Sequence, residues 1–497
     1  RPALVVHHHF MSILKENKGD LPGAVAESQK AVKILEQLVA QYGGLTPQGL
    51  RLKELSPKVY DNSTRLLAKS GDVQQAVVTI DRAQQLLSLG QLEPKSGQNS
   101  PIAGNLNKIR RIRAEITALE SNLGSSPKGS ELAEDKSKLE NAQSRFLKEI
   151  AQIRGQHPEY ERLLSVRPIE FGKLQKSIPA DTVVVQYFPS DERLYLFVLT
   201  SESLQVRQAE IGREALKNKT VEFRRGIITL AAKDDLAQSL YKTLIGPVEA
   251  DIAGKKVLVL VPTGTLAYLP FAALKKGDSY LIESHQLAIV QQSSQLESLT
   301  KSATPGDGTT VVVGNPDETL PSAELEAETV GSFFAKVKLL VRGEATMGSL
   351  LDSLKGPVPY LHLATHGVLD CTDPTASYIV LAGSRLHNYE IAGLTLNGTR
   401  LVTLSACQTA LGSQDPGSEV ASIAQAFGFA GAPCVIATLW SIDDQETKAL
   451  MSEFYARLKA GDSVAEAMNK SQIALLKSPQ SAAPFFWAGF QVGGDWR

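Results

Sequence analysis

The chain has 497 residues, of which 43% are hydrophobic and 21% are charged, a composition typical of a folded protein with two or three domains. Its 52 basic and 53 acidic residues leave a net charge of −1, so no overall basic field exists to drive nonspecific nucleic-acid binding, and we expect no direct nucleic-acid partner. No apolar stretch approaches the roughly 18 residues that cross a membrane, so we expect no membrane partner.

The three cysteines indicate a reducing compartment, because they cannot all pair and form no disulfide framework. Cys434 lies in an apolar run typical of a buried strand, and Cys371 follows a histidine-containing turn closely, where we interpret it as a bystander. The first residues lack the pattern of a signal peptide. We predict a cytoplasmic location, or an extracytoplasmic one if a signal precedes Arg1.

The sequence pattern of residues 1–90 predicts helical repeats. Two similar segments begin with Gly-Asp at Gly19 and Gly71, and each continues with small alanines and apolar residues at helical spacing. This pattern resembles tetratricopeptide repeats, which implies a surface that binds a protein activator or regulator. The offset between the copies is longer than in such repeats, so either the helices are extended or the segment Gly43 to Gln48 is an insertion.

Residues 101–164 predict a helical hairpin or coiled-coil linker, because a charged helical pattern is broken only by the Gly- and Ser-rich segment 124–130. Past residue 177 the pattern changes to short apolar runs that alternate with helical stretches of 10 to 15 residues, which is typical of a mostly parallel sheet flanked by helices. We therefore predict an α/β fold, preceded by the all-α repeat region, and we divide it into residues 165–305 and 306–497.

Two of the apolar runs end at chemically capable side chains. YLHLATHG ends at His366 and Gly367, and RLVTLSACQTALG contains Cys407. Open parallel sheets bind ligands beyond the carboxyl ends of their strands, and an imidazole there can take the proton of a thiol that is otherwise mostly neutral. A core cysteine and a surface histidine are the alternative for either residue alone; together they form a candidate catalytic dyad.

Several segments resemble, in order, the CHAT family of caspase-like domains that are found with tetratricopeptide repeats. They are VLVLVPTGTLAYLPFAAL, YLIESHQLAIVQQSSQL, VVVGNP with LPSAELEAETV, HLATHG, TLSACQTALG, GSEVASIAQAFGFAGAPCVIATLWSIDDQETKALMSEFY and SAAPFFWAGFQVGG. The resemblance covers about two thirds of the chain and implies a caspase-like fold, a bacterial-type protein and the mechanism shared with caspases, separase and gingipain. It further implies that residues 165–305 form a regulatory, pseudo-caspase-like part and residues 306–497 the catalytic caspase-like part.

The resemblance implies that His366 is the base or proton donor and Cys407 the nucleophile, with the backbone N–H groups of Gly367 and Cys407 as the oxyanion hole. The family pattern contains a further histidine, His362, to which we assign a structural role.

The resemblance to separase implies a basic residue at the substrate position before the cleaved bond (P1), because an acidic residue follows the Leu-Trp pair there. Asp443 and Asp444 match that place and are candidates for the P1 pocket. Either residue could equally cap the helix that follows. Metacaspase-like enzymes place an acid where this chain has Ser405, and Arg385 and Arg400 stay open as readers of an acidic P1 residue.

We predict a cysteine endopeptidase that cleaves protein substrates after a basic residue and is regulated by partner binding to the repeats, without a metal or other cofactor. Ordering of the segments Leu369 to Thr375 and Gly412 to Gly417 would then activate it. The alternative is a noncatalytic interaction scaffold in a signalling or defence complex. A nucleotide-binding domain is disfavoured, because no glycine-rich phosphate loop is present.

Overall fold

The computed structural model describes residues 2–42, 47–91, 137–138, 141–142, 144–145, 148, 171–299, 307–368, 377–396, 398–405, 419–442 and 444–497. The chain forms two compact units. One contains Arg1–Gly90 and Pro94–Pro168, and the other contains Gln91–Glu93 and Ile169–Arg497. The predicted hairpin at 101–164 lies outside the described residues, apart from the few helical positions between 137 and 148.

The first unit contains two helical hairpins, formed by α1 (Pro2–Asn17) with α2 (Leu21–Tyr42) and by α3 (Pro47–Ser70) with α4 (Val73–Gln91). Both turns use the same chemistry. Gly19 and Gly71 adopt φ of 81° and 85°, a left-handed conformation that costs glycine little. The carboxylates of Asp20 and Asp72 then accept hydrogen bonds from backbone N–H groups in the first turn of the next helix. The helical prediction is confirmed, and helices of 22 and 24 residues (α2 and α3) account for the long offset.

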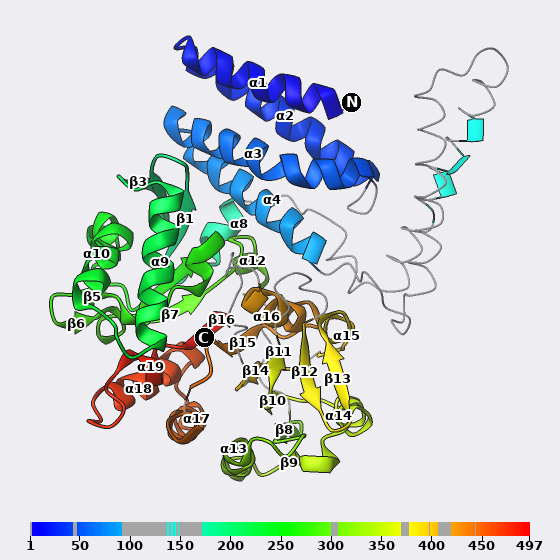
Figure 1. The fold of residues 1–497 in the computed structure, drawn as a ribbon, viewed down its shortest axis with the longest axis vertical. Helices are drawn as coiled ribbons and strands as arrows, with labels where there is room; N and C mark the ends of the chain where they lie inside the picture. Colours follow the sequence, from blue (N-terminus) through cyan, green and yellow to red (C-terminus); the bar gives the residue numbers. More distant parts are fainter. Residues whose placement is uncertain are drawn as a thin grey trace. The chain divides into compact units, whose positions relative to one another are not determined.

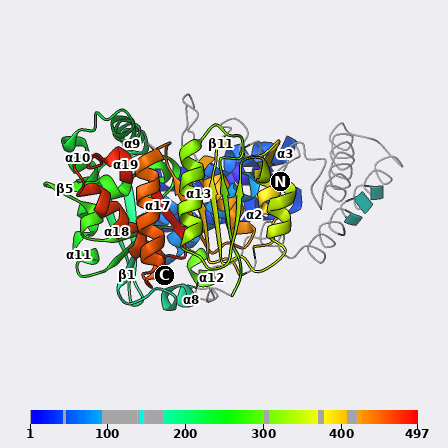
Figure 2. The same cartoon turned by 90° about the horizontal axis from the view of Figure 1, so that it is seen from below.

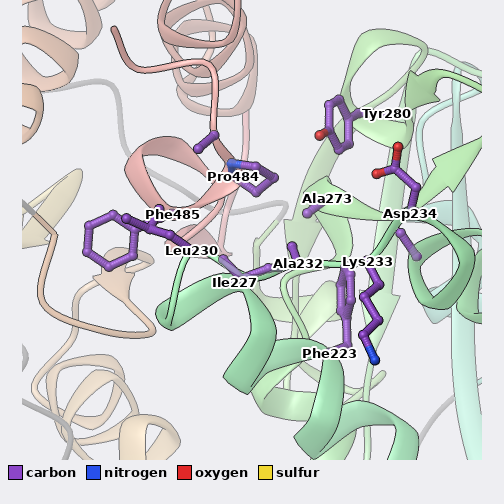
Figure 3. A pocket seen from close by; sticks show the side chains of 12 residues that line it. Phe223, Ile227, Leu230, Ala232, Lys233, Asp234, Ala273, Tyr280, Pro484 and Phe485 are labelled. Carbon is purple, nitrogen blue, oxygen red and sulfur yellow. The ribbon is translucent and has the colours of Figure 1, made fainter.

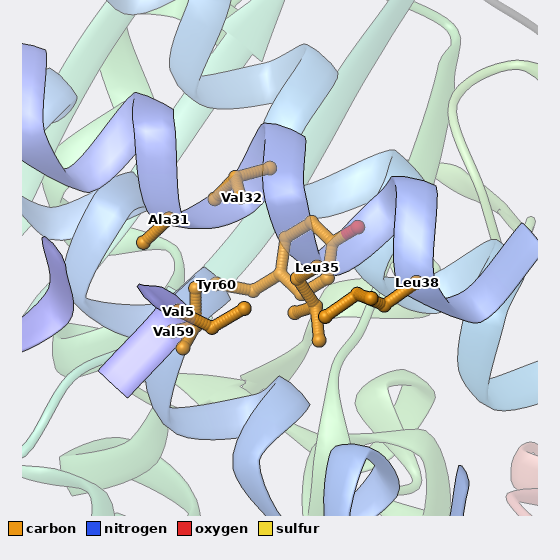
Figure 4. Close-up of a cluster of buried hydrophobic side chains, with 7 residues drawn as sticks. All are labelled: Val5, Ala31, Val32, Leu35, Leu38, Val59 and Tyr60. Carbon is orange, nitrogen blue, oxygen red and sulfur yellow. The ribbon is translucent and has the colours of Figure 1, made fainter. Parts of the chain in front are cut away.

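Three of these helices share an apolar core. Figure 4 shows the side chains that α1, α2 and α3 contribute to it, namely Val5, Ala31, Val32, Leu35, Leu38, Val59 and Tyr60. A carboxylate on α1, Glu16, contacts Arg65 and Lys69 of α3 beside this core. Apolar burial and this ion-pair cluster together hold the first helix on the third.

The second unit is built on one sheet of eleven strands, in the order β3-β2-β1-β4-β7-β16-β15-β14-β10-β8-β9 (Figure 1). Its strands are β1 (Thr182–Pro189), β2 (Leu194–Leu199), β3 (Leu204–Ala209), β4 (Val257–Val261), β7 (Gln286–Ile289), β8 (Thr310–Gly314), β9 (Val337–Val341), β10 (Tyr360–Ala364), β14 (Leu401–Leu404), β15 (Cys434–Thr438) and β16 (Phe490–Gly494). Smaller sheets are formed by β5 (Lys275–Lys276) with β6 (Ser279–Tyr280), and by β11 (Gly367–Val368), β12 (Tyr378–Leu381) and β13 (Ser384–His387).

Nine strands of the large sheet form two parallel blocks, and β2 and β3 extend the sheet beyond β1 by antiparallel pairing. Strands β15, β14, β10, β8 and β9 run in one direction, and β16, β7, β4 and β1 run in the other, so the blocks meet at the antiparallel pair β15/β16. Strands from both predicted parts, 165–305 and 306–497, thus belong to one sheet, and the division between these parts stays a prediction.

Helices flank this sheet, which confirms the predicted α/β class after an all-helical region. They are α8 (Phe171–Lys176), α9 (Arg213–Ile228), α10 (Asp234–Leu244), α11 (Glu249–Ile252), α12 (Gln295–Leu299), α13 (Pro321–Ser332), α14 (Met347–Ser353), α15 (Asn388–Ala392), α16 (Glu419–Phe429), α17 (Asp444–Lys459), α18 (Val464–Leu476) and α19 (Pro484–Trp487). Helices α13 and α17 lie side by side, as Figure 2 shows, and α13 packs on β8 and β10. In the part of the chain that the structure describes, no helix is long and apolar enough to cross a membrane.

Candidate active site

The candidate site lies where three neighbouring parallel strands end. Strand β10 pairs with β8 on one side and with β14 on the other, and Leu363 is in register with both Val313 and Leu404. All three strands are rich in buried aliphatic residues, which favours a parallel sheet covered on both faces. The segments that follow them, which begin at Asn315, Thr365 and Ser405, therefore leave the sheet at one edge.

His366 is fixed at this edge by the small sheet beside it. Its carbonyl accepts a hydrogen bond from the Val380 N–H at 2.9 Å, and the Thr365 hydroxyl donates to the Val380 carbonyl at 2.9 Å. Gly367 follows in β11, where it is buried and in register with Ile379. The backbone on both sides of His366 is thus held while its side chain stays 19% exposed.

The imidazole of His366 contacts the loop that follows β8. Its Nε2 atom lies 2.7 Å from the Thr319 hydroxyl oxygen and 3.9 Å from the Asp317 carboxylate. The Thr319 hydroxyl donates its proton to Asp317 at 2.8 Å, so its oxygen must accept from Nε2–H. This arrangement places the proton of a neutral imidazole on Nε2 and leaves Nδ1 as the proton acceptor.

The loop itself is held by Asn315, which adopts a φ of 49° and accepts the Leu320 N–H on its side-chain oxygen at 2.7 Å. Asp317 and Thr319 were not among the predicted site residues. The signal that could have found them is a short polar stretch, NPDET, directly after a buried strand.

Cys407 and Asp443 lie outside the described residues, as do Cys371 and both predicted gating segments. Asp444 is the first residue of α17, and its side chain lies outside the description as well. The predicted helix start is confirmed, whereas the nucleophile, the oxyanion hole and the P1 pocket stay predictions. Cys434 is buried in β15 as predicted, and burial raises the pKa of its thiol.

Arg385 and Arg400 were considered as residues that bind an acidic P1 side chain, and the structure describes both. Arg400 precedes β14 and so lies at the opposite, amino end of the strand, where it contacts the Tyr360 hydroxyl. Arg385 is in β13 and stacks its guanidinium 4.5 Å from the centre of the Tyr378 ring.

His362 is fully buried in β10, in agreement with its predicted structural role. Its Nδ1 atom lies 3.1 Å from the Tyr455 hydroxyl, and its Nε2 atom lies 2.9 Å from the Glu326 carboxylate. That second contact is close but not aligned as a hydrogen bond, and neither atom has another hydrogen-bond partner among the described residues.

A cavity of about 160 Å³ lies elsewhere in the same unit, between α9, α10 and α19 (Figure 3). Its walls are mostly apolar and include Phe223, Ile227, Pro484 and Phe485. None of the residues that line it belongs to the edge around His366, so this cavity and the candidate site are separate features.

Comparison with known proteins identifies similar proteins and a matching family. The human protein "Tetratricopeptide repeat protein 28" is 25% identical over 323 residues, which are 52% of this chain and 13% of that protein. The mouse protein of the same name is 25% identical over 331 residues, with the same shares. The chain thus spans 13% of the length of these curated relatives.

Among solved structures, Saccharomyces cerevisiae separase in its complex with securin aligns with a TM-score of 0.46 and 11% identity, over 96% of this chain and 44% of that one. The Arg-specific cysteine proteinase gingipain R aligns with a TM-score of 0.36 and 12% identity, over 57% of this chain and 74% of that one. The family model described as "CHAT domain" matches residues 234–495, more than half of the chain, and the chain therefore belongs to the CHAT domain family.

Proposed function

We propose that this protein is a cysteine endopeptidase in which His366 is the general base and Cys407 the nucleophile. The observation that supports this most strongly is the register of β10 and β14. Leu363 pairs with Leu404, and His366 follows Leu363 by the same three residues by which Cys407 follows Leu404. Two parallel strands in register deliver such positions to the same edge of a sheet.

The state of His366 suits this chemistry. Thr319 holds Nε2–H, so Nδ1 takes the proton of the Cys407 thiol, and the thiolate attacks the carbonyl carbon of the scissile peptide bond. The N–H groups of Gly367 and Cys407 stabilise the oxyanion of the tetrahedral intermediate. The imidazolium then protonates the leaving amine, and water hydrolyses the thioester to release the acid and the free thiol.

The same proposal includes the specificity for the P1 residue and the regulation of cleavage. Asp443 or Asp444 receives a basic P1 side chain through a charge-assisted pair, and the N-terminal repeats bind a protein that regulates cleavage. The position of Asp444 is compatible with the first point, because it follows the carboxyl end of β15, a strand of the same parallel block as β10 and β14.

A noncatalytic scaffold is the second candidate. The observation that favours it is the name of the human and mouse relatives, which refers to tetratricopeptide repeats. In that case His366 and Cys407 would be dispensable for the function, and the helical region would carry it.

Cleavage of a peptide library with Arg or Lys at P1 distinguishes the two candidates. The wild type and a Cys434→Ala control should cleave it, because Cys434 is buried in β15, whereas Cys407→Ala should not. Equal product from the wild type and Cys407→Ala, with a candidate partner present, would contradict the peptidase proposal. Asp443→Ala and Asp444→Ala then separate the roles of these residues: loss of a pocket residue changes P1 preference, whereas loss of a cap costs only about 1 kcal/mol of stability.

A further inference from the structure

A buried cluster of polar side chains lies beneath the candidate site. It is formed by residues of α13, β10, β14 and α17 and of the turn after β14, and we name it the Glu326 cluster; its members are Glu326, His362, Thr403, Ser405 and Tyr455. Glu326 is 4% exposed, and His362 and Thr403 are fully buried. Burial of this many polar groups is costly unless they satisfy one another.

The contacts of the cluster form a chain across the sheet face. The Ser405 hydroxyl donates to one Glu326 oxygen at 3.1 Å, and the other Glu326 oxygen lies 2.9 Å from His362 Nε2. The Tyr455 hydroxyl lies 3.1 Å from His362 Nδ1 and 2.9 Å from the Thr403 hydroxyl. The strand that precedes His366 and the strand that precedes Cys407 are thus joined through one carboxylate and one imidazole.

The charges of the cluster are compatible with this arrangement. The neighbouring Glu324 is neutralised by Arg342, whose Nε donates to it at 2.8 Å, so that arginine does not serve Glu326. Burial raises the pKa of Tyr455, and its hydroxyl therefore remains a donor. Where Tyr455 donates to His362 Nδ1, a neutral imidazole carries its proton on Nε2, the atom that faces Glu326.

We propose that Glu326 is a positioning residue for the strand end that leads to Cys407; this rests on the peptidase function proposed above. Ser405 stands two residues before Cys407, and it is held on two sides. Its backbone N–H donates to the Leu363 carbonyl at 3.0 Å, and its hydroxyl donates to Glu326. The Ser405 side chain is thus directed towards a buried acid on α13.

The test compares Ser405→Ala, which removes the donor, with Ser405→Thr, which keeps a hydroxyl. A hydrogen bond to a buried charged group is worth about 10- to 100-fold in an equilibrium or rate. We expect Ser405→Ala to lower kcat by about that factor with little change in KM, and Ser405→Thr to restore most of it. In a double-mutant cycle, Ser405→Ala should cost much less in a Glu326→Ala background than in the wild type, because the contact between the two residues is already absent there.

Ser293→Ala is the matched control, because Ser293 also donates a buried hydroxyl hydrogen bond, to Gln186 at 3.0 Å, at a different place in the same unit. It should lower the free energy of unfolding, by less than Ser405→Ala because its acceptor is a neutral amide oxygen, while leaving kcat unchanged. If Ser405→Ala retains wild-type kcat, or if Ser293→Ala lowers kcat as strongly, Glu326 has no positioning role.

Hydrogen exchange at the Ser405 amide separates this proposal from the peptidase proposal. In Ser405→Ala and in Glu326→Ala, exchange at residue 405 should accelerate about tenfold or more, and in Ser293→Ala it should stay at the wild-type rate. Unchanged exchange in all variants would overturn the positioning role even if the wild type cleaves peptides. If exchange accelerates as expected but the wild type and Cys407→Ala are equally inactive, the link between Ser405 and Glu326 stands and the peptidase function is refuted.

Discussion

The orientation of His366 depends on one intervening hydroxyl. The carboxylate of Asp317 is 3.9 Å from the imidazole Nε2, which is too long for a hydrogen bond, and Thr319 spans the gap with contacts of 2.7 and 2.8 Å. Asp317 therefore contacts the histidine through Thr319, and in the proposed peptidase this hydroxyl would orient the base. The direct contact with the imidazole is thus made by a threonine rather than by the acid.

Replacing Thr319 with valine should lower kcat about tenfold, because the imidazole loses the acceptor that fixes its tautomer. Thr319→Ser keeps the hydroxyl and should stay within about threefold of the wild type. Steady-state cleavage of a P1-Arg peptide measures both. Thr229→Val is a suitable control, since Thr229 is exposed and its hydroxyl donates to carbonyl groups of its own helix; an equal loss of kcat in that variant would contradict the role of Thr319.

Cys434 should resist alkylation in the folded protein. Burial raises the pKa of its thiol, so the thiol stays neutral at neutral and mildly alkaline pH, and the neutral form is a poor nucleophile. Peptide mass mapping after iodoacetamide treatment at pH 8 should show Cys434 unmodified in native protein and modified after denaturation. Modification of Cys434 at the same rate in both states would contradict its burial.

At the scale of elements, the packing of α13 on β8 requires a glycine. A Cβ atom added to Gly314 would lie 2.5 Å from the Ala327 Cβ and 3.0 Å from the Ala323 carbonyl oxygen, closer than van der Waals contact permits. This close approach brings α13, and with it Glu326, against β10. The last residue of β8 therefore controls both the helix position and the buried cluster.

Gly314→Ala should lower the free energy of unfolding by about 1–3 kcal/mol, because the helix must move away from the sheet. Gly356→Ala is the control, since an added Cβ there meets nothing within 4 Å. Urea denaturation followed by tryptophan fluorescence suits this comparison, as Trp440, Trp487 and Trp496 are all in the second unit. Equal stability of the two variants would show that the contact is tolerated.

The ion pairs between α1 and α3 make the stability of the helical unit dependent on pH. Hydrogen bonds from Arg65 and Lys69 lower the pKa of Glu16 to about 2 from 4.5. A carboxyl with a depressed pKa in the folded state contributes stability above pH 4.5 that is lost as the pH falls towards 2. After allowance for screening by water, we expect a loss of about 1–2 kcal/mol.

Far-ultraviolet circular dichroism during urea unfolding at pH 7 and at pH 3 tests this expectation. It detects the loss of helix directly, whereas tryptophan fluorescence does not report on the first unit, which contains none of the three tryptophans. Glu16→Gln should be less stable than the wild type at pH 7 and should depend less on pH. The exposed Glu222 provides a control in the other unit, and Glu222→Gln should retain the full dependence. A pH dependence that persists unchanged in Glu16→Gln would assign it to other groups.

The sequence predicts the elements whose pattern is local and misses those that depend on distant partners. The apolar runs of β10, β14 and β15 were predicted as strands, because nearly all of their residues are buried and most of them are apolar. Strands β3, β7 and β16 were not predicted: β3 carries exposed polar residues, β7 alternates buried with half-buried residues, and β16 ends in two glycines. In the site, His366 was predicted from its strand, whereas Thr319 was missed because a loop far away in sequence brings it there.

At the scale of the whole molecule, the strand β16 joins the two parallel blocks. It lies between β7 and β15, and Val492, which is 2% exposed, is in register with Ile436. A proline at this position removes a backbone donor in the middle of the sheet, which only edge strands tolerate. The cost should be on the order of 4 kcal/mol.

Val492→Pro should therefore abolish the cooperative folding of the second unit, seen as the loss of the buried tryptophan fluorescence. Gln208→Pro places the same residue on β3, the first strand in the order of the sheet, and should leave the unit folded. Similar unfolding curves for the two variants would show that β16 is not needed to hold the blocks together.

The position of β16 in the sequence also matters during biosynthesis. Every other strand of the sheet precedes it, so the strands of both blocks leave the ribosome before residues 490–494 do. Until then β7 and β15 each present an open edge, and such edges attract other chains. The nascent protein is therefore most exposed to chaperones, and to misassociation with its own copies, in the interval just before this strand is made.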